Sequence, residues 1–105
     1  MKIINMTPHV IKFIIGENIV EIPASGNLAR VSVKTETIGE IDGIPITTSV
    51  FGEVEGLPAP SEDTIYIVSS LVASRCTERT DVFIPNESIR DSEGRIVGCK
   101  SLGKI

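Results

Sequence analysis

The sequence predicts an α+β fold, in which a hairpin-rich mixed β-sheet carries one short helix in a C-terminal βαβ unit. Two short turn signals, Gly16-Glu17 and Asp42-Gly43, separate alternating apolar runs in the first half of the chain, and such turns close β-hairpins. Later, a continuous apolar run precedes a helix signal and another short strand, which is the order of a βαβ unit. With 105 residues, 41% of them hydrophobic, the chain is expected to form a single domain, residues 1–105.

The first hairpin is expected to join residues 10–15 to residues 18–22 through a type II′ turn, because its turn has glycine in first position. Counting back from the turn gives the pairs Ile15–Asn18, Phe13–Val20, Ile11–Ile22 and Lys12–Glu21. One face of this hairpin is then apolar, and the other carries an ion pair.

The second hairpin is expected to join residues 28–41 to residues 44–50 through a type I′ turn, with Ile41 opposite Ile44. Strand alternation places one set of apolar side chains on a common face: Ala29, Val31, Val33, Ile41, Ile44, Ile46 and Val50. This pattern predicts a half-buried sheet. Pro45 lacks an N–H donor, which either places its strand at an edge or puts its amide position toward solvent.

Residues 52–61 are rich in glycine and proline and are interpreted as an ordered connection. A strand over residues 64–68 and a strand over residues 82–84, ended by the following proline, are expected to flank a helix that starts at residue 69 and ends near residue 79. The connection is long enough for a right-handed crossover, so the two strands should be parallel neighbours. A last strand is expected over residues 95–99.

Composition excludes several function classes. A net charge of −4 with 4% aromatic residues argues against a nucleic-acid partner. No stretch is long and apolar enough for a membrane span, and the first residues do not resemble a signal peptide, so the protein is expected to be soluble and cytoplasmic, with no membrane partner. Two cysteines and one histidine predict reduced thiols, no metal site and no cofactor.

The strand-to-helix junction at Ser69 and Ser70 is the first candidate site. Backbone amides at a helix start carry partial positive charge and bind phosphate or carboxylate, and the two hydroxyls add donors. The alternative is that these serines only cap the helix. No Gly-rich nucleotide-binding motif is present, so a nucleoside-triphosphate loop is not indicated.

The polar group Asn5, Thr7 and His9 lies between the first two strands and can hydrogen-bond a base or a ribose. The alternative is a local turn stabilised by these side chains. His9 could also act as a general base, although no serine or cysteine nucleophile motif accompanies it.

The turn that contains Ser25, followed by Arg30, is a third candidate, because turn amides and a guanidinium can hold an anion. The alternative for Arg30 is an ordinary surface charge. The predicted ligand-binding residues are therefore Asn5, Thr7, His9, Ser25, Arg30, Ser69 and Ser70.

Six motifs cover nearly the whole chain: Asn5-x-Thr7-Pro8-His9, Pro23-x-Ser25-Gly26, Ala29-Arg30-Val31-Ser32, Phe51-Gly52-x-Val54-x-Gly56-Leu57-Pro58, Tyr66-Ile67-Val68-Ser69 and Arg90-Asp91-x-x-Gly94-Arg95-Ile96-Val97-Gly98. Together they resemble a small protein family that recurs in bacteriophages, prophages and bacterial genomes. Small phage proteins include sponges that sequester nucleotide immune signals, such as the cyclic ADP-ribose relatives made by Thoeris-type defence systems. By this analogy the resemblance implies an anti-defence protein, located in the host cytoplasm, that binds a nucleotide-type ligand without turnover.

Two other functions stay open. One is a hydrolase or lyase that degrades such a signal with His9 as acid or base. The other is a phage structural or protein-interaction module, which the hairpin-rich first half favours. A homo-oligomer is expected for the ligand-binding function, because a domain this small offers limited pocket depth.

Overall fold

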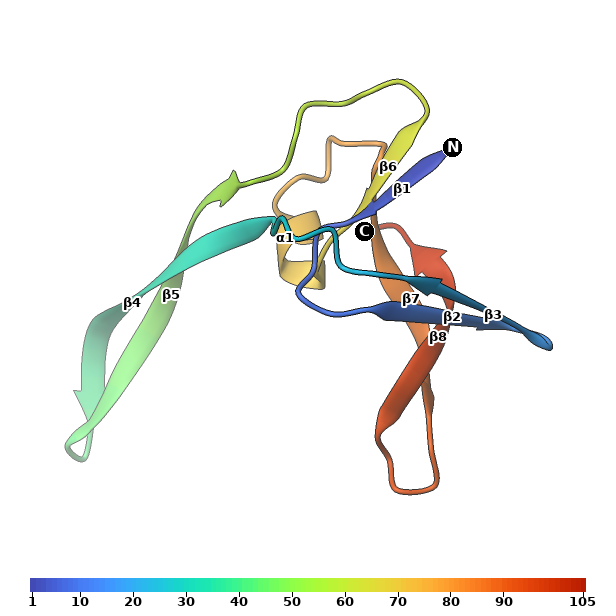
Figure 1. Cartoon of the computed structure of the whole chain (residues 1–105). Coiled ribbons are helices and arrows are strands. Elements are labelled where there is room, and N and C mark those ends of the chain that lie inside the picture. The colour runs from blue at the N-terminus through green and yellow to red at the C-terminus, as the bar shows by residue number, and fades with distance from the viewer.

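The computed structural model describes all 105 residues and contains eight strands and one short helix (Figure 1). The elements are β1 (Lys2–Asn5), β2 (Ile11–Ile15), β3 (Asn18–Ile22), β4 (Arg30–Ile41), β5 (Ile44–Glu55), β6 (Thr64–Ile67), α1 (Ser70–Ser74), β7 (Val82–Arg90) and β8 (Ile96–Gly103). Strands hold 57% of the residues and helix 5%, so the fold is essentially all-β and the predicted α+β class is wrong.

The helix α1 is shorter than expected because the chain leaves helical geometry at Arg75, which has φ −100° and ψ 0°. Further along, the Arg79 side chain donates to the Asp81 carboxylate and to the Pro58 carbonyl oxygen, which fixes the return of the chain toward β7. The connection from β6 to β7 is therefore mostly loop. The two strands it joins nevertheless pair in parallel, as predicted for neighbours across a crossover.

Six strands form one curled mixed sheet in the order β1-β6-β7-β8-β2-β3. Strands β1, β6 and β7 are parallel, whereas β8 is antiparallel to β7 and β3 is antiparallel to β2. The two ends of this order meet where Asn5, the last residue of β1, bridges to Ala24, two residues after the end of β3. The sheet therefore curls until its two edges touch at one point.

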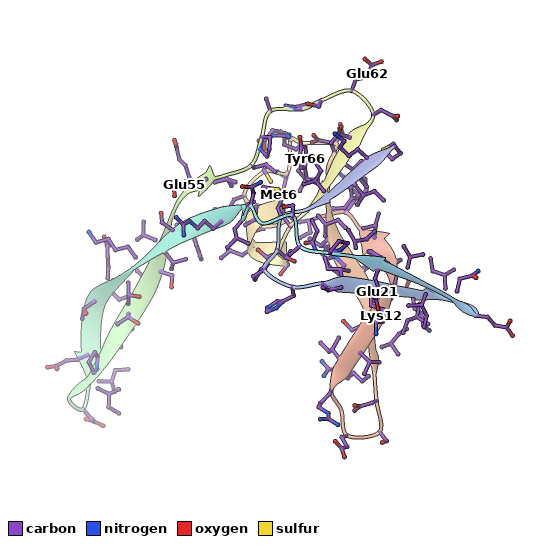
Figure 2. The ribbon with its side chains drawn as sticks, viewed as in Figure 1. Met6, Lys12, Glu21, Glu55, Glu62 and Tyr66 are labelled. Carbon is purple, nitrogen blue, oxygen red and sulfur yellow. The ribbon has the colours of Figure 1, made fainter.

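The first predicted hairpin is confirmed. Strands β2 and β3 pair in the expected register, including Phe13 opposite Val20, and Gly16 has the positive φ of 61° that a type II′ turn needs in first position. Lys12 and Glu21 form an ion pair of 3.6 Å on the more exposed face (Figure 2).

Strands β4 and β5 form a separate two-stranded sheet that projects from the rest of the molecule (Figure 1). We call residues 30–55 the arm. The type I′ turn is confirmed, since Asp42 has φ 49° and Gly43 has φ 80°, and Ile41 lies opposite Ile44. Side chains fan out along both strands (Figure 2).

The predicted half-buried face of the second hairpin is wrong, because almost every arm residue is exposed. The two strands also shift register twice, between Val31 and Val33 and between Thr37 and Gly39. Such a shift reverses which residues share a face. Val50 consequently lies opposite Lys34 rather than on the face of Val33.

Three strands are longer than predicted. β5 includes Gly52 to Glu55, which were expected in a loop; β8 extends to Gly103; and β7 continues through Pro85 instead of ending there. The Val68 N–H donates to the Phe83 carbonyl oxygen at 2.9 Å, and the next bond of this parallel ladder would need an N–H at residue 85. Proline has no N–H, so the pairing of β7 with β6 ends at Phe83, while β7 continues beside β8 with Pro85 opposite Leu102.

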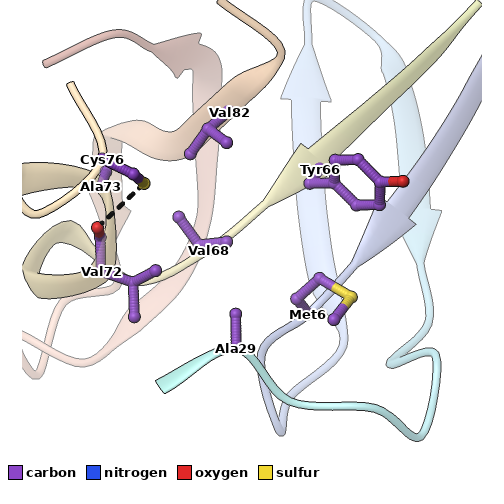
Figure 3. Packing of buried hydrophobic residues seen from close by; sticks show 8 residues of the cluster. All are labelled: Met6, Ala29, Tyr66, Val68, Val72, Ala73, Cys76 and Val82. Carbon is purple, nitrogen blue, oxygen red and sulfur yellow. Dashed lines mark hydrogen bonds between the residues drawn. The ribbon is translucent and has the colours of Figure 1, made fainter. Parts of the chain in front are cut away.

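The core has two parts. The larger cluster packs α1 and β6 against the chain before β4, and its members are Met6, Ala29, Tyr66, Val68, Val72, Ala73, Cys76 and Val82 (Figure 3). The smaller cluster, inside the curled sheet, contains Ile11, Phe13, Ile67 and Cys99. Only 14 residues are buried, which leaves a small core for a chain of this length.

Candidate functional site

The predicted polar residues gather around the ends of β1 and β6. These parallel strands lie side by side, with Asn5 opposite Ile67, and the Met6 N–H donates to the Ile67 carbonyl oxygen at 2.8 Å. The segment before β4 joins them, because the Ser25 N–H donates to the Asn5 carbonyl oxygen at 3.0 Å and the Ala29 N–H to the Met6 carbonyl oxygen at 3.1 Å. We call this region the strand-end corner.

Asn5 has a structural role at this corner. It is 1% exposed. Its Nδ2 donates to the carbonyl oxygens of His9 at 2.7 Å and Ile22 at 3.1 Å, and its Oδ1 accepts from the Thr7 N–H at 3.0 Å and the Thr7 hydroxyl at 2.7 Å. These four bonds use the full capacity of the amide. Asn5 and Thr7 therefore form the local turn that was the alternative to ligand binding.

The serines at the corner also bond within the chain. The Ser25 hydroxyl donates to the Asn27 carbonyl oxygen and accepts from the Asn27 N–H, and the Ser69 hydroxyl accepts from the Val72 N–H at 3.4 Å as the N-cap of α1. A helix as short as α1 has few aligned peptide dipoles, so its start offers little attraction for an anion. Ser69 therefore caps the helix, which was the alternative to ligand binding at this residue.

Three predicted residues keep free polar side chains. His9, Arg30 and Ser70 are exposed, and their side chains form no hydrogen bond or ion pair with the rest of the chain. Arg30 begins β4 opposite Glu55, directly after the residue that bonds to Met6. Each of these side chains can donate hydrogen bonds to an anionic ligand.

The hollows of the surface lie elsewhere, and none is lined by a predicted site residue. The largest, about 640 Å³, lies between β2–β3 and β7–β8 and includes Lys12 and Glu21. A second, about 380 Å³, lies between β5 and the end of α1 and carries charged side chains such as Arg75 and Glu78. Each is built from segments that are distant in sequence, so local patterns gave no signal for them.

The third hollow, about 280 Å³, is almost entirely apolar and lies between β1, β3 and β8 at the open end of the curled sheet. No local sequence pattern indicates this hollow, because it exists only where the edges of β1 and β3 move apart from the bridge between Asn5 and Ala24. We call it the apolar hollow.

The exposure of the arm was also not indicated by local sequence patterns. Seven large apolar side chains of the arm are each at least 36% exposed: Val33, Ile38, Ile41, Ile44, Ile46, Val50 and Phe51. Phe51 also contacts a charged group, since the Arg75 guanidinium lies 4.4 Å from the centre of its ring. The arm is therefore a candidate interaction surface.

One ion pair and two buried thiols have shifted pKa values. The two hydrogen bonds from Arg79 hold the pKa of Asp81 below its usual value, and the same contact raises the pKa of Arg79. Burial raises the pKa of the free thiols Cys76 and Cys99. No group of three or more histidine, cysteine or acidic side chains comes together.

No protein-family model, curated protein or solved structure matches the chain. The single helix is too short to cross a bilayer.

Proposed function

We propose that this chain is an assembly module, a structural or protein-interaction protein whose working form contains several copies joined through the arm. The observation that supports this function is the arm itself, an exposed two-stranded ribbon rich in large apolar side chains. A ribbon of two strands is at best marginally stable in water unless a further strand or surface packs against it. The arm therefore needs a partner surface.

The dimensions of the molecule support the same function. Its radius of gyration is 16.9 Å, whereas a compact domain of this length is expected to have about 13 Å. Its accessible surface is 7241 Å², compared with about 5,700 Å² for a compact protein of the same mass. The surplus of about 1,500 Å² is large enough for stable protein contacts.

Sedimentation of the purified protein tests this function. We expect the wild-type chain to sediment as a multiple of 11.3 kDa and the double variant Ile41→Ser/Ile44→Ser, which keeps the turn residues between them, to shift strongly toward the single chain. Ile105→Ser is the matched control, because it removes a similarly exposed isoleucine outside the arm. A wild-type monomer, or a double variant that associates like the wild type, contradicts the assembly function.

A second candidate function is sequestration of a nucleotide-derived immune signal of the cyclic ADP-ribose type. The observation that favours it is the group of free donors at the strand-end corner: His9, Arg30 and Ser70. No hollow of the single chain encloses these groups. A second copy would have to complete the enclosure of a ligand there.

Incubation with a panel of nucleotides, followed by heat release and chromatography, tests this candidate. Release of an unchanged ligand indicates binding, release of an altered ligand indicates a hydrolase or lyase, and no retention contradicts both. If a ligand binds, Arg30→Ala and Ser70→Ala should each weaken its affinity about tenfold to a hundredfold in calorimetry. Thr7→Val is unsuitable for this purpose, because Thr7 bonds to the buried Asn5.

A further inference from the structure

We propose that the arm of one copy docks in the apolar hollow of a second copy, between the free edges of β1 and β3. This inference rests on the proposed assembly function and names the surface that receives the arm.

The apolar hollow has the chemistry of a docking site. Phe13 and Ile67 form its buried floor, and Ile3, Ile15, Val20 and Leu102 line it while remaining 36% to 55% exposed. Large apolar side chains that surround a hollow and stay in water favour an apolar occupant.

Backbone groups beside the hollow are also unpaired. Strand β1 pairs only with β6 and strand β3 only with β2, apart from the single bridge between Asn5 and Ala24. From this bridge the two strand edges diverge toward the β2–β3 turn and the N-terminus (Figure 1). Open strand edges bind another extended strand through main-chain hydrogen bonds, so the occupant should be a β-strand or ribbon.

The arm is both apolar and extended, as the occupant of the hollow must be. It is a β-ribbon, and its outer half carries exposed apolar side chains: Ile38, Ile41, Ile44 and Ile46. The arm and the β2–β3 hairpin extend from opposite sides of the molecule (Figure 1). The arm therefore cannot fill the hollow of its own chain without a large rearrangement, and the contact joins two copies.

Charge favours the hollow over another arm as the docking surface. The outer arm, residues 35–50, contains Glu36, Glu40 and Asp42 and no lysine or arginine. Lys100 lines the hollow. Two arms placed together would oppose carboxylates. An arm in the hollow instead brings carboxylates toward the ammonium group of Lys100.

The surface area agrees with this arrangement. Each copy gives one arm and receives one arm, so each chain takes part in two contacts. A standard interface buries about 800 Å² per partner. Two such contacts account for the surplus surface of about 1,500 Å² relative to a compact chain.

Disulfide trapping between variants that each carry one added cysteine tests the contact. Ile41→Cys, Ile44→Cys and Ile46→Cys sample the outer arm, and Val20→Cys samples the hollow; the native thiols are buried. Each arm variant is mixed with the Val20→Cys variant, equilibrated and oxidised. Val97→Cys is the matched control, because Val97 is a similarly exposed valine that lines a different hollow.

We expect at least one arm variant to form a disulfide-linked heterodimer with Val20→Cys in clear excess over the heterodimer with Val97→Cys, since a disulfide requires close approach of the two Cβ atoms. Equal yields with both partners, or arm-to-arm dimers as the main product, would overturn the docking proposal.

Sedimentation of Val20→Asp gives an independent measurement. A carboxylate in the hollow should repel the acidic outer arm and reduce association as strongly as the arm double variant, whereas Val97→Asp should associate like the wild type. If the arm variant dissociates but Val20→Asp does not, the docking surface is wrong and the assembly function stands. If the arm variant itself has no effect, the assembly function fails.

Discussion

A single buried amide joins the two edges of the curled sheet. Asn5 is the last residue of β1, and its Nδ2 reaches the last residue of β3, Ile22, as well as the loop carbonyl of His9. Several of the polar residues that suggest a ligand site in the sequence therefore form hydrogen bonds that hold the edges of the sheet together.

Asn5→Asp should destabilise the protein strongly. The substitution replaces the donating amide with an oxygen that faces two carbonyl groups, and each unsatisfied or repelled buried group costs about 1 to 3 kcal/mol. We expect a loss of about 3 kcal/mol or more in the free energy of unfolding, measured by urea denaturation. Thr7→Val, which removes only one bond to the same amide, should cost about 1 kcal/mol. Equal losses for the two variants would contradict the role assigned to Nδ2.

The contact between Arg79 and Asp81 predicts a pH dependence of stability. Two bonds of 2.9 Å between partly buried side chains lower the pKa of Asp81 in the folded state. A lowered carboxyl pKa stabilises the fold at pH values above the unfolded pKa of about 3.9, and this stabilisation is lost as the pH falls through the folded pKa.

Asp81→Asn should therefore cost about 1.5 to 3 kcal/mol near neutral pH, and less as the solution is acidified. Thermal melts of both proteins from neutral to acidic pH measure the difference. A stability gap that stays constant down to strongly acidic pH would show that the charge on Asp81 does not contribute.

At the scale of elements, the base of the arm depends on a close backbone approach at Gly56. This residue follows β5 with φ 85°, and a Cβ built on it would lie 2.2 Å from the Leu28 carbonyl oxygen. Neither the conformation nor the contact tolerates a side chain.

Gly56→Ala should displace the arm from the body and weaken the packing of Ala29, which lies beside the same contact. We expect a loss of about 1 to 3 kcal/mol in thermal denaturation, because the substitution combines a strained φ with a steric clash. Gly39→Ala, within β4 and with open space around its Cβ position, is the control. Similar stability of the two variants would mean that the close backbone approach at Gly56 does not contribute to the stability of the fold.

The sequence predicted the elements that local chemistry determines. Turn residues such as Gly16 and Asp42-Gly43 set the hairpin registers next to them, and both registers are confirmed near the turns. The two register shifts along the arm have no comparable local signal, so face assignments far from the turn failed. The free position of the arm, the pairing of β2 with β8 and the apolar hollow all depend on contacts between distant segments. Among the candidate residues, sequence could not separate Asn5, which is fully bonded, from Arg30, which is free.

The molecule combines a small core with an extended shape. Only 14 residues are buried, and the principal extents are 54, 40 and 23 Å. A single chain leaves much of its apolar surface in water, both on the arm and around the hollow. Association of copies would bury these surfaces and add to the driving force that the core of one chain provides.

Stability should consequently depend on protein concentration. When folding and association are coupled, mass action stabilises the native assembly, and in a dimer each tenfold rise in concentration contributes about 1.4 kcal/mol. We expect the melting temperature of the wild type to increase steadily with concentration in calorimetry, and that of Ile41→Ser/Ile44→Ser to stay nearly constant.

Hydrogen exchange provides the local measurement: arm amides should be protected at high concentration and exchange rapidly on dilution, because a lone ribbon opens readily. Amides of β6, whose Ile67 is completely buried, should stay protected throughout. An arm that exchanges at the same fast rate at every concentration would show that it has no partner in another copy.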